Sequence, residues 1–199
     1  MDLMARIQGI LLKPKEEWVK IKAEATPIPT LFTSYAVLLA AIPAAAQFIG
    51  LALIGQRIPF YGWYRYPIGT ALLYSIVSYI FALVMTYVLG IIINALAPTF
   101  SSKSNAENAM KLAVYSMTAT WVAGVLHIIP ILGILVIIAG LYGLYILYLG
   151  FNSPMMDTPK DKVISYFVVS LIIAVVLMVV VALILGAIFA VGTVGGRVL

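Results

Sequence analysis

The sequence predicts an all-α integral membrane protein with five transmembrane helices, preceded by a short amphipathic helical segment on the cytoplasmic side. Composition is the first observation: of 199 residues, 64% are hydrophobic and 10% are charged, whereas a soluble domain is about half apolar and a quarter charged. Secondly, the apolar residues come in runs longer than a soluble core needs. Thirdly, five of these runs approach or exceed the ~20 residues that cross the hydrocarbon of a bilayer.

Residues 1–25 form the first predicted unit, a cytoplasmic or interfacial segment of two short helices. Pro14 begins the second helix, and lysines occupy the faces opposite the apolar ones. One interpretation is that the helices lie on anionic lipid or dock a partner, with Trp18 at headgroup level. The other is that they pack over the cytoplasmic ends of the bundle. The apolar faces carry Leu3, Ile7 and Ile10 or Leu11 in the first helix and Trp18, Ile21 and Ala25 in the second.

Residues 26–199 form the second unit, a single five-helix membrane domain. None of its predicted spans contains Asp, Glu, Lys or Arg. The third and fourth spans run together and are too long for one crossing, so we predict a tight helical hairpin that turns near His127, Pro130 and Gly133. A single kinked helix is the alternative. The predicted spans cover residues 31–55, 68–97, 112–129, 131–149 and 163–191.

Basic residues fall unequally on the two sides that these spans define. The richer side is expected to face the cytoplasm, which places the amino terminus inside, the carboxyl terminus outside and the chain in the cytoplasmic (inner) membrane. All seven Asp and Glu residues fall on that same side. The predicted cytoplasmic side holds Arg6, Lys13, Lys15, Lys20, Lys22, Lys103, Lys111, Lys160 and Lys162, and the outer side holds Arg57, Arg65 and Arg197.

The inventory of reactive side chains argues against an enzyme. The chain has no cysteine, which excludes thiolate nucleophiles and zinc–thiolate sites. Its one histidine, His127, ends the third span on the outer side, away from every side-chain carboxylate, so a histidine–carboxylate dyad is not expected. No metal, nucleotide or nucleic-acid motif is present. We therefore predict no catalytic residue, no cofactor, no metal and no nucleic-acid partner.

Two sets of residues are candidates for function instead. The first would contact a partner or lipid; it includes the connection from Gly150 to Lys162, whose methionines we expect to be exposed and adaptable. The alternative is that this connection is an ordered loop covering the bundle end. This set comprises Trp18, Lys20, Lys22, Met155, Met156, Asp157 and Lys160.

The second set is uncharged or weakly basic and lies within the spans. It would line a narrow polar path, although such residues also serve as hydrogen-bonding contacts between helices. Small residues at Ala36, Ala40 and Ala44 permit close helix approach, either within one bundle or along a homodimer seam. The polar set comprises Gln47, Asn94, Thr118 and His127.

Several short motifs occur in order along nearly the whole chain. They are Leu12-Lys13-Pro14 with Trp18 and Ile21, Ala97-Pro98-Thr99-Phe100, Lys111-Leu112-Ala113-Val114-Tyr115-Ser116, Trp121-Val122-Ala123-Gly124, Ile129-Pro130, Leu141-Tyr142-Gly143-Leu144-Tyr145 and Leu149-Gly150. Together they resemble the bacterial branch of the YIP family, the Ypt/Rab-interacting membrane proteins. Ser101 and Ser102 stand where that branch commonly has paired glycines. The resemblance implies five membrane helices, a cytoplasmic amino terminus and an exterior carboxyl terminus.

Eukaryotic members of this family are linked to Rab GTPases and membrane shaping. Their acidic cytoplasmic motif is not evident in this sequence, so we do not expect this chain to bind a GTPase. The expected function is a non-enzymatic scaffold that organises membrane lipids or binds a membrane or cytoplasmic protein. The alternative is a small permease or channel, which would act as a homo-oligomer.

Overall fold

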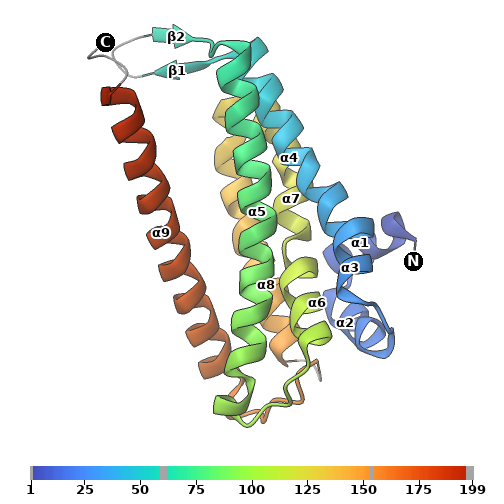
Figure 1. Ribbon diagram of the computed structural model, residues 1–199. Coiled ribbons are helices and arrows are strands. Elements are labelled where there is room, and N and C mark those ends of the chain that lie inside the picture. Colours follow the sequence, from blue (N-terminus) through green and yellow to red (C-terminus); the bar gives the residue numbers. More distant parts are fainter. Residues whose placement is uncertain (1, 59–61, 153–154, 196–199) are drawn as a thin grey trace.

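The computed structural model describes residues 2–58, 62–152 and 155–195, and it shows a bundle of long helices with two short helices against its side (Figure 1). Within this described part, five helical stretches are long and apolar enough to cross a membrane, which confirms the predicted number of spans. These stretches are Ile28–Ile54, Ile68–Phe100, Ala106–Ile128, Pro130–Asn152 and Val163–Val181.

The helices follow one another in a simple up-and-down order. The first half of the described chain contains α1 (Leu3–Leu12), α2 (Pro14–Ala23), α3 (Ile28–Leu31), a π-helical turn (Phe32–Ala36), α4 (Val37–Ile49), a second π-helical turn (Gly50–Ile54), β1 (Gln56–Ile58), β2 (Gly62–Tyr64) and α5 (Ile68–Leu96). The second half contains 3₁₀ turns at Ala97–Phe100, Gly124–Ile128 and Pro130–Leu132, and the helices α6 (Ala106–Ser116), α7 (Thr118–Ala123), α8 (Gly133–Asn152) and α9 (Val163–Gly195).

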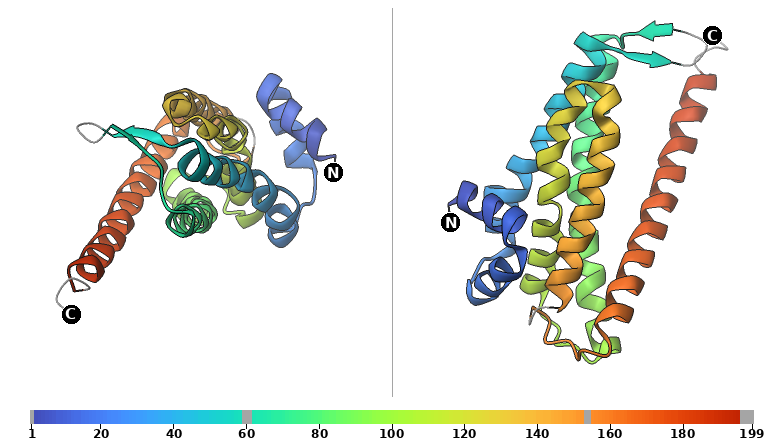
Figure 2. Two further views of the ribbon diagram at one scale, coloured as in Figure 1. Left: turned by 90° about the horizontal axis from the view of Figure 1, so that it is seen from above. Right: turned by 180° about the vertical axis from the view of Figure 1, so that it is seen from behind.

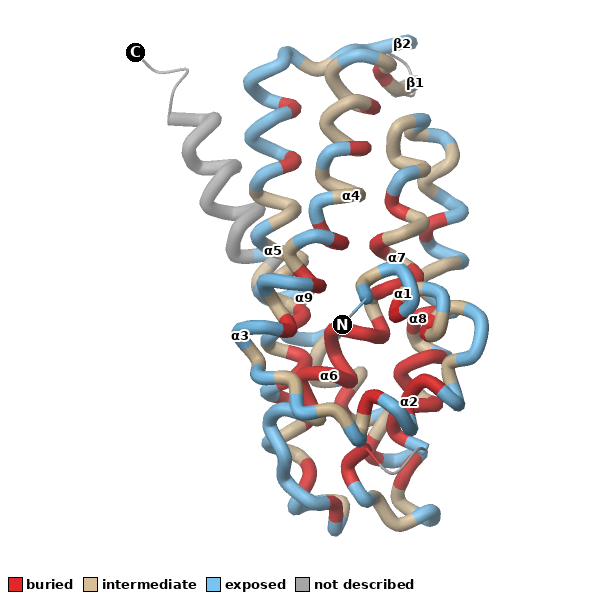
Figure 3. The backbone as a smooth tube through the Cα atoms, turned by 90° about the vertical axis from the view of Figure 1, so that its right-hand side faces the viewer, coloured by how far each residue is buried: buried red, intermediate tan, exposed pale blue. Residues whose placement is uncertain are grey.

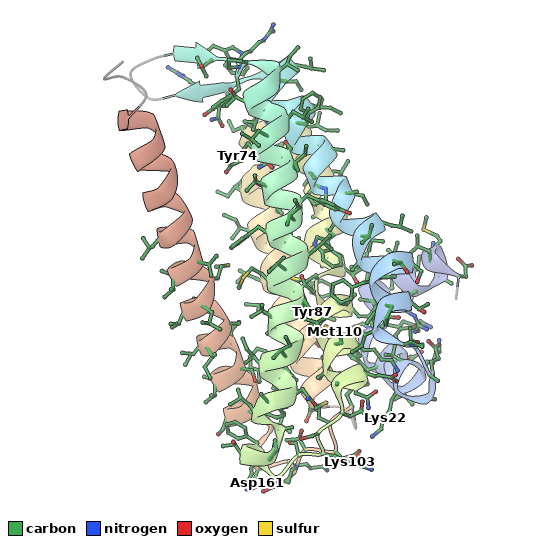
Figure 4. The ribbon with its side chains drawn as sticks, in the orientation of Figure 1. Lys22, Tyr74, Tyr87, Lys103, Met110 and Asp161 are labelled. Carbon is green, nitrogen blue, oxygen red and sulfur yellow. The ribbon has the colours of Figure 1, made fainter. Side chains whose placement is uncertain are left out.

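The two ends of the bundle differ in charge. We call the end where α6 and α9 begin the charged end, and the end that carries the antiparallel β1–β2 pair the hairpin end (Figure 1). Lys22, Lys103 and Asp161 lie toward the charged end (Figure 4), whereas Arg57 lies in β1 at the hairpin end. The segregation of charge expected from the sequence is therefore present in three dimensions; Arg197 lies outside the described residues.

The two N-terminal helices form for local reasons. The Asp2 carboxylate caps α1 by accepting the Met4 backbone N–H at 3.0 Å. Pro14 is the first residue of α2, where its missing N–H costs nothing. Acidic side chains in the first turn of α2 and basic ones in the last complement the helix dipole. Both predicted helices are thus confirmed.

The third and fourth spans form a hairpin. Ile129, in an extended conformation, separates two 3₁₀ turns, and Pro130 begins the second of them. The two arms then pack closely: a Cβ atom at Gly143 of α8 would lie 2.9 Å from the Ser116 carbonyl oxygen of α6. This close antiparallel contact rules out a single kinked helix.

The third span is the centre of the bundle. Of its most apolar window, 67% is buried, against 17–28% in the other four spans. Many of the buried residues lie around α1, α2 and α6, toward the charged end (Figure 3). Ala36 and Ala40 are also buried inside the bundle, so the first two members of the small-residue stripe pack within one chain.

The last helix leaves the bundle as it rises. Near the charged end Val163, Tyr166 and Ser170 are buried, and Tyr166 donates a hydrogen bond to the Ile93 carbonyl of α5. Further along, Val175 and Val176 are exposed. Two views show α9 diverging from the other helices (Figure 2). Exposed valines on a membrane helix are suited to contact with lipid.

The turn after α5 has an unusual backbone. Ser101 has a φ angle of 54°, in the left-handed region that glycine adopts most readily. This residue ends the 3₁₀ turn, and the next N–H, of Ser102, donates to the Ala97 carbonyl at 2.9 Å. Ser101 thus adopts a backbone conformation that glycine adopts more readily, at one of the two positions where the resemblance implies glycine.

Candidate functional site at the charged end

Trp18 anchors α2 to the bundle. Its side chain is fully buried, and its Nε1 donates to the Ile146 carbonyl of α8 at 3.0 Å. Glycine at position 150 makes room for the indole, because a Cβ there would lie 2.9 Å from Trp18 Cε2 and 2.3 Å from Leu112 Cδ2. The structure therefore places Trp18 between helices, where its side chain is shielded from the surface.

A buried group of charges joins α1 to α2. Arg6 donates from Nη1 to Glu17 Oε1 at 2.5 Å and from Nη2 to the Glu24 carboxylate. Glu17 also accepts a bond from Lys20 at 3.0 Å. We call these four residues the N-terminal ion cluster. The Arg6 and Glu17 side chains are only 5% and 7% exposed. Because water does not reach these two charges, each is compensated by the other.

Two further contacts fix this cluster to the third span. The Arg6 guanidinium lies 5.5 Å from the centre of the Tyr115 ring, within the range of a cation–π interaction. Lys111 is buried, and its Nζ donates to the backbone carbonyls of Ile21, at 3.3 Å, and Glu24. A lysine at the end of a helix caps its last carbonyls and complements its dipole. Lys111 thus holds the end of α2 against α6.

The described part of the connection after α8 packs against the bundle, and its methionines are not exposed. Met155 and Met156 are buried, so the prediction of exposed methionines is wrong. The reason is that the backbone of this segment is held against the start of the third span. The Met155 carbonyl accepts from Asn108 Nδ2 at 2.9 Å, and the Met156 carbonyl accepts from the Lys103 N–H at 2.9 Å. Ser153 and Pro154 lie outside the described residues.

The charged members of the first candidate set do reach the surface. Lys20, Asp157 and Lys160 are exposed, and Lys22 is partly exposed. Lys22 forms an ion pair with Asp157, which ties α2 to the loop after α8. The surface formed by these four residues is called the charged platform below.

The residues of the second candidate set lie in different parts of the bundle. Gln47 and His127 line one cavity of about 150 Å³ together with Ser78, and His127 Nδ1 lies 3.1 Å from the Gly124 carbonyl. Thr118 lies elsewhere, fully buried, where it donates to the Tyr115 carbonyl at 2.6 Å and contacts Tyr35 Oη at 2.8 Å. Thr118 therefore acts as a contact between helices.

Asn94 is also separate from the cavity. It lies near the end of α5 at the charged end, and within the described part of the chain its buried Oδ1 has no hydrogen-bond donor. The structure thus brings together two of the four residues proposed for a polar path, and the other two are not among those that line the cavity.

The sequence does not reveal the N-terminal ion cluster or the cap on α2. In the sequence, Arg6 and Lys111 register only as positive charges on one side of the membrane. The one available signal was the place of Lys111 at the start of an otherwise apolar span, since a lysine there needs a partner.

Comparison with known proteins gives one match. A family model described as the Yip1 domain matches residues 9–194, which include α2 and all five spans. No curated protein and no solved structure matches the chain. Within the described residues, no group of three or more His, Cys, Asp or Glu side chains could hold a metal ion.

Proposed function

This chain belongs to the Yip1 domain family, and we propose that it is a multi-pass membrane scaffold that organises lipid or binds a protein partner at its charged end. In this proposal the charged end faces the cytoplasm, because it carries most of the lysines and arginines. The membrane is the cytoplasmic one. The family is not known for enzymatic activity, which supports a non-enzymatic role.

The observation that carries this proposal is that α1 and α2 are fixed to the bundle. Trp18 and Lys111 fasten α2 to α8 and α6, and the Lys22–Asp157 ion pair joins it to the loop after α8. The charged platform is therefore one preorganised surface made from two distant parts of the chain. Binding to such a surface avoids the entropic cost of ordering it first.

A site-specific crosslinker tests the scaffold role. With a photo-reactive amino acid in place of Lys160, we expect capture of one defined protein in stoichiometric amount from intact membranes. Placed instead at Ile131, which is exposed beside the hairpin end, the same group should capture no such protein. In the variant that carries the photo-reactive amino acid at position 160, the further change Lys20→Glu should lower capture at least fivefold. This change reverses a charge on the same platform. Equal capture from both positions, or none from Lys160, would contradict a platform for a protein partner.

A small permease or channel is the second candidate, and the cavity lined by Gln47, Ser78 and His127 favours it. If that cavity is part of a path, Gln47→Leu should reduce solute or ion flux through purified protein in liposomes severalfold, because it removes the amide from the wall. Thr118→Val is the matched control, since Thr118 is not among the residues that line the cavity. The permease role would be refuted by flux that is absent, or that is unaltered by Gln47→Leu.

A further inference from the structure

We propose that the cavity lined by Gln47, Ser78 and His127, together with an apolar groove between α4 and α5, binds one neutral lipid whose head carries hydroxyl groups. The head occupies the cavity, and the acyl chain lies in the groove. This site goes beyond the proposed scaffold role and needs no protein partner. It is carried by the unmet hydrogen bonds of the cavity, by its size and depth, and by the groove that adjoins it.

The cavity is polar although it lies inside the bundle. Its three polar side chains come from separate elements, since Gln47 belongs to α4, Ser78 to α5 and His127 to the 3₁₀ turn that ends the third span. In the described part of the chain, neither the Gln47 amide nor the Ser78 hydroxyl makes a hydrogen bond. Polar groups inside a membrane bundle are costly when they have no partner. The cavity therefore favours an occupant that forms hydrogen bonds.

The wall of the cavity offers both donors and acceptors. His127 Nδ1 lies 3.1 Å from the Gly124 carbonyl oxygen, so in the neutral ring Nδ1 carries the proton and Nε2 is an acceptor. The Gln47 amide and the Ser78 hydroxyl can each donate and accept. A head with hydroxyl groups can bond to all three side chains. A head with carbonyl groups alone would leave His127 Nε2 without a donor.

The size of the cavity excludes a large head. Its volume is about 150 Å³, and a cavity of about this volume in another protein holds benzene. Glycerol has the same number of non-hydrogen atoms as benzene and therefore fits. Phosphocholine has nearly twice as many and does not fit.

The depth of the cavity excludes a charged head. Gln47 lies seven residues before the end of the first span and Ser78 ten residues after the start of the second, about 10–15 Å from the hairpin end of each helix. Because these spans exceed the ~30 Å of hydrocarbon by about 10–20 Å in all, the cavity lies just inside the hydrocarbon. A charged head loses its hydration there. The described residues of the wall carry no Asp, Glu, Lys or Arg to compensate it.

A groove for the acyl chain adjoins the cavity. It has a volume of about 260 Å³, and its wall includes Phe48 and the exposed Leu72 and Ile76, so it faces lipid. Ala44 and Tyr79 line both hollows, which therefore meet at these two residues. The groove follows α4 and α5, which lie side by side (Figures 1 and 2). A lipid can thus enter from the bilayer, head first.

One hydroxyl in the groove matches the ester of such a lipid. Ser75 is buried and lines the groove, and within the described residues its Oγ has no hydrogen-bond partner. Ser75 and Ser78 are three residues apart on α5 and so lie on the same side of the helix. An ester carbonyl next to a head held at Ser78 can accept from Ser75. Hydrocarbon alone offers Ser75 no acceptor, so an acyl chain of bulk lipid leaves it unpaired.

Photolabelling of the full-length protein in nanodiscs of phosphatidylcholine tests this site. The probe is a monoacylglycerol with a photo-reactive group in its acyl chain, and the labelled residues are mapped by mass spectrometry. We expect the label to concentrate on α4 and α5 beside the groove. Unlabelled monoacylglycerol should compete at least tenfold more strongly than lysophosphatidylcholine with the same chain, because only the head differs.

Three variants remove different parts of the site. Gln47→Leu, at the head, and Ser75→Ala, at the ester, should each reduce labelling about fivefold, which corresponds to the loss of one hydrogen bond. Ala44→Leu fills the place where the two hollows meet and should reduce labelling more than tenfold.

The matched controls make the same kinds of change elsewhere. Ser170→Ala removes another buried hydroxyl that has no partner among the described residues, and Ala95→Leu enlarges an exposed alanine of α5. Neither residue is among those that line the two hollows. Both controls should label within twofold of the wild type. Equal competition by the two lipids, label spread evenly over the spans, or an equal loss in the controls would each overturn the site.

The result is separable from the tests of the proposed functions. The nanodiscs contain no other protein, so failed crosslinking at position 160 leaves the lipid site standing. Labelling without flux would support the lipid site and refute the permease. Flux that depends on Gln47 in a protein that the probe does not label would overturn the lipid site alone.

Discussion

Arg6→Met should destabilise the attachment of α1 and α2 to the bundle by about 3–5 kcal/mol, the cost of breaking a buried ion pair from one side. Glu17 would then keep a buried carboxylate whose remaining described partner is the exposed Lys20. Hydrogen exchange of the backbone amides in α1 and α2 measures this directly. We expect their protection to fall toward that of an undocked segment, while α5 and α8 keep theirs.

The matched control replaces both charges. Arg6→Met combined with Glu17→Met removes the orphaned carboxylate and leaves two apolar side chains of suitable size in a buried position. We expect this double variant to recover most of the lost protection. Should the double variant be as unprotected as Arg6→Met alone, the charges would be positioning α1 through more than their mutual attraction. Unchanged protection in Arg6→Met would contradict the ion cluster as a structural element.

Gly50→Val should lower the stability of the whole bundle by about 3 kcal/mol, the upper part of the usual range for overpacking. A Cβ atom at position 50 would lie 2.2 Å from the His127 carbonyl oxygen and 3.1 Å from the Ile128 carbonyl oxygen. Both are backbone atoms, which cannot rotate away as a side chain would. The end of the first span must therefore separate from the turn between the third and fourth spans.

Thermal unfolding in a mild detergent measures this effect, as a lowered midpoint and a larger aggregated fraction. Gly69→Val is the control, because nothing lies within 4 Å of a Cβ at that position. It should unfold within a degree or two of the wild type. If Gly50→Val unfolded together with Gly69→Val, the close crossing at the hairpin end would be wrong.

The spans could be predicted from sequence because the bilayer imposes them. Lipid offers no partner for a backbone amide, so runs such as 68–97 have to be helices of a set length. The start of the second N-terminal helix could be predicted equally well, because the first turn is the place within a helix where proline is favoured. These features depend on neighbours in the chain, and the structure confirms them.

The contacts at the charged end could not be predicted, because they join distant parts of the chain. Arg6 binds Glu24 across 18 residues, and Lys111 binds the carbonyl of Ile21 across 90. Nothing local in the composition of residues 155 and 156 shows that Asn108 and Lys103 will hold that backbone and bury the methionines. Local pattern also left the place of Trp18 open, because its helical spacing suits a lipid interface and a helix interface equally.

The attachment of α2 also sets an order of events during synthesis. Trp18 is made early, but the carbonyl it binds belongs to Ile146, 128 residues later. At about 5–20 residues per second, the ribosome needs roughly 6 to 25 s to supply that partner. During this interval α1 and α2 leave the ribosome without the surface on which they later rest. Their docking can be completed only after the fourth span has been inserted, so a docked amino terminus reports a finished hairpin.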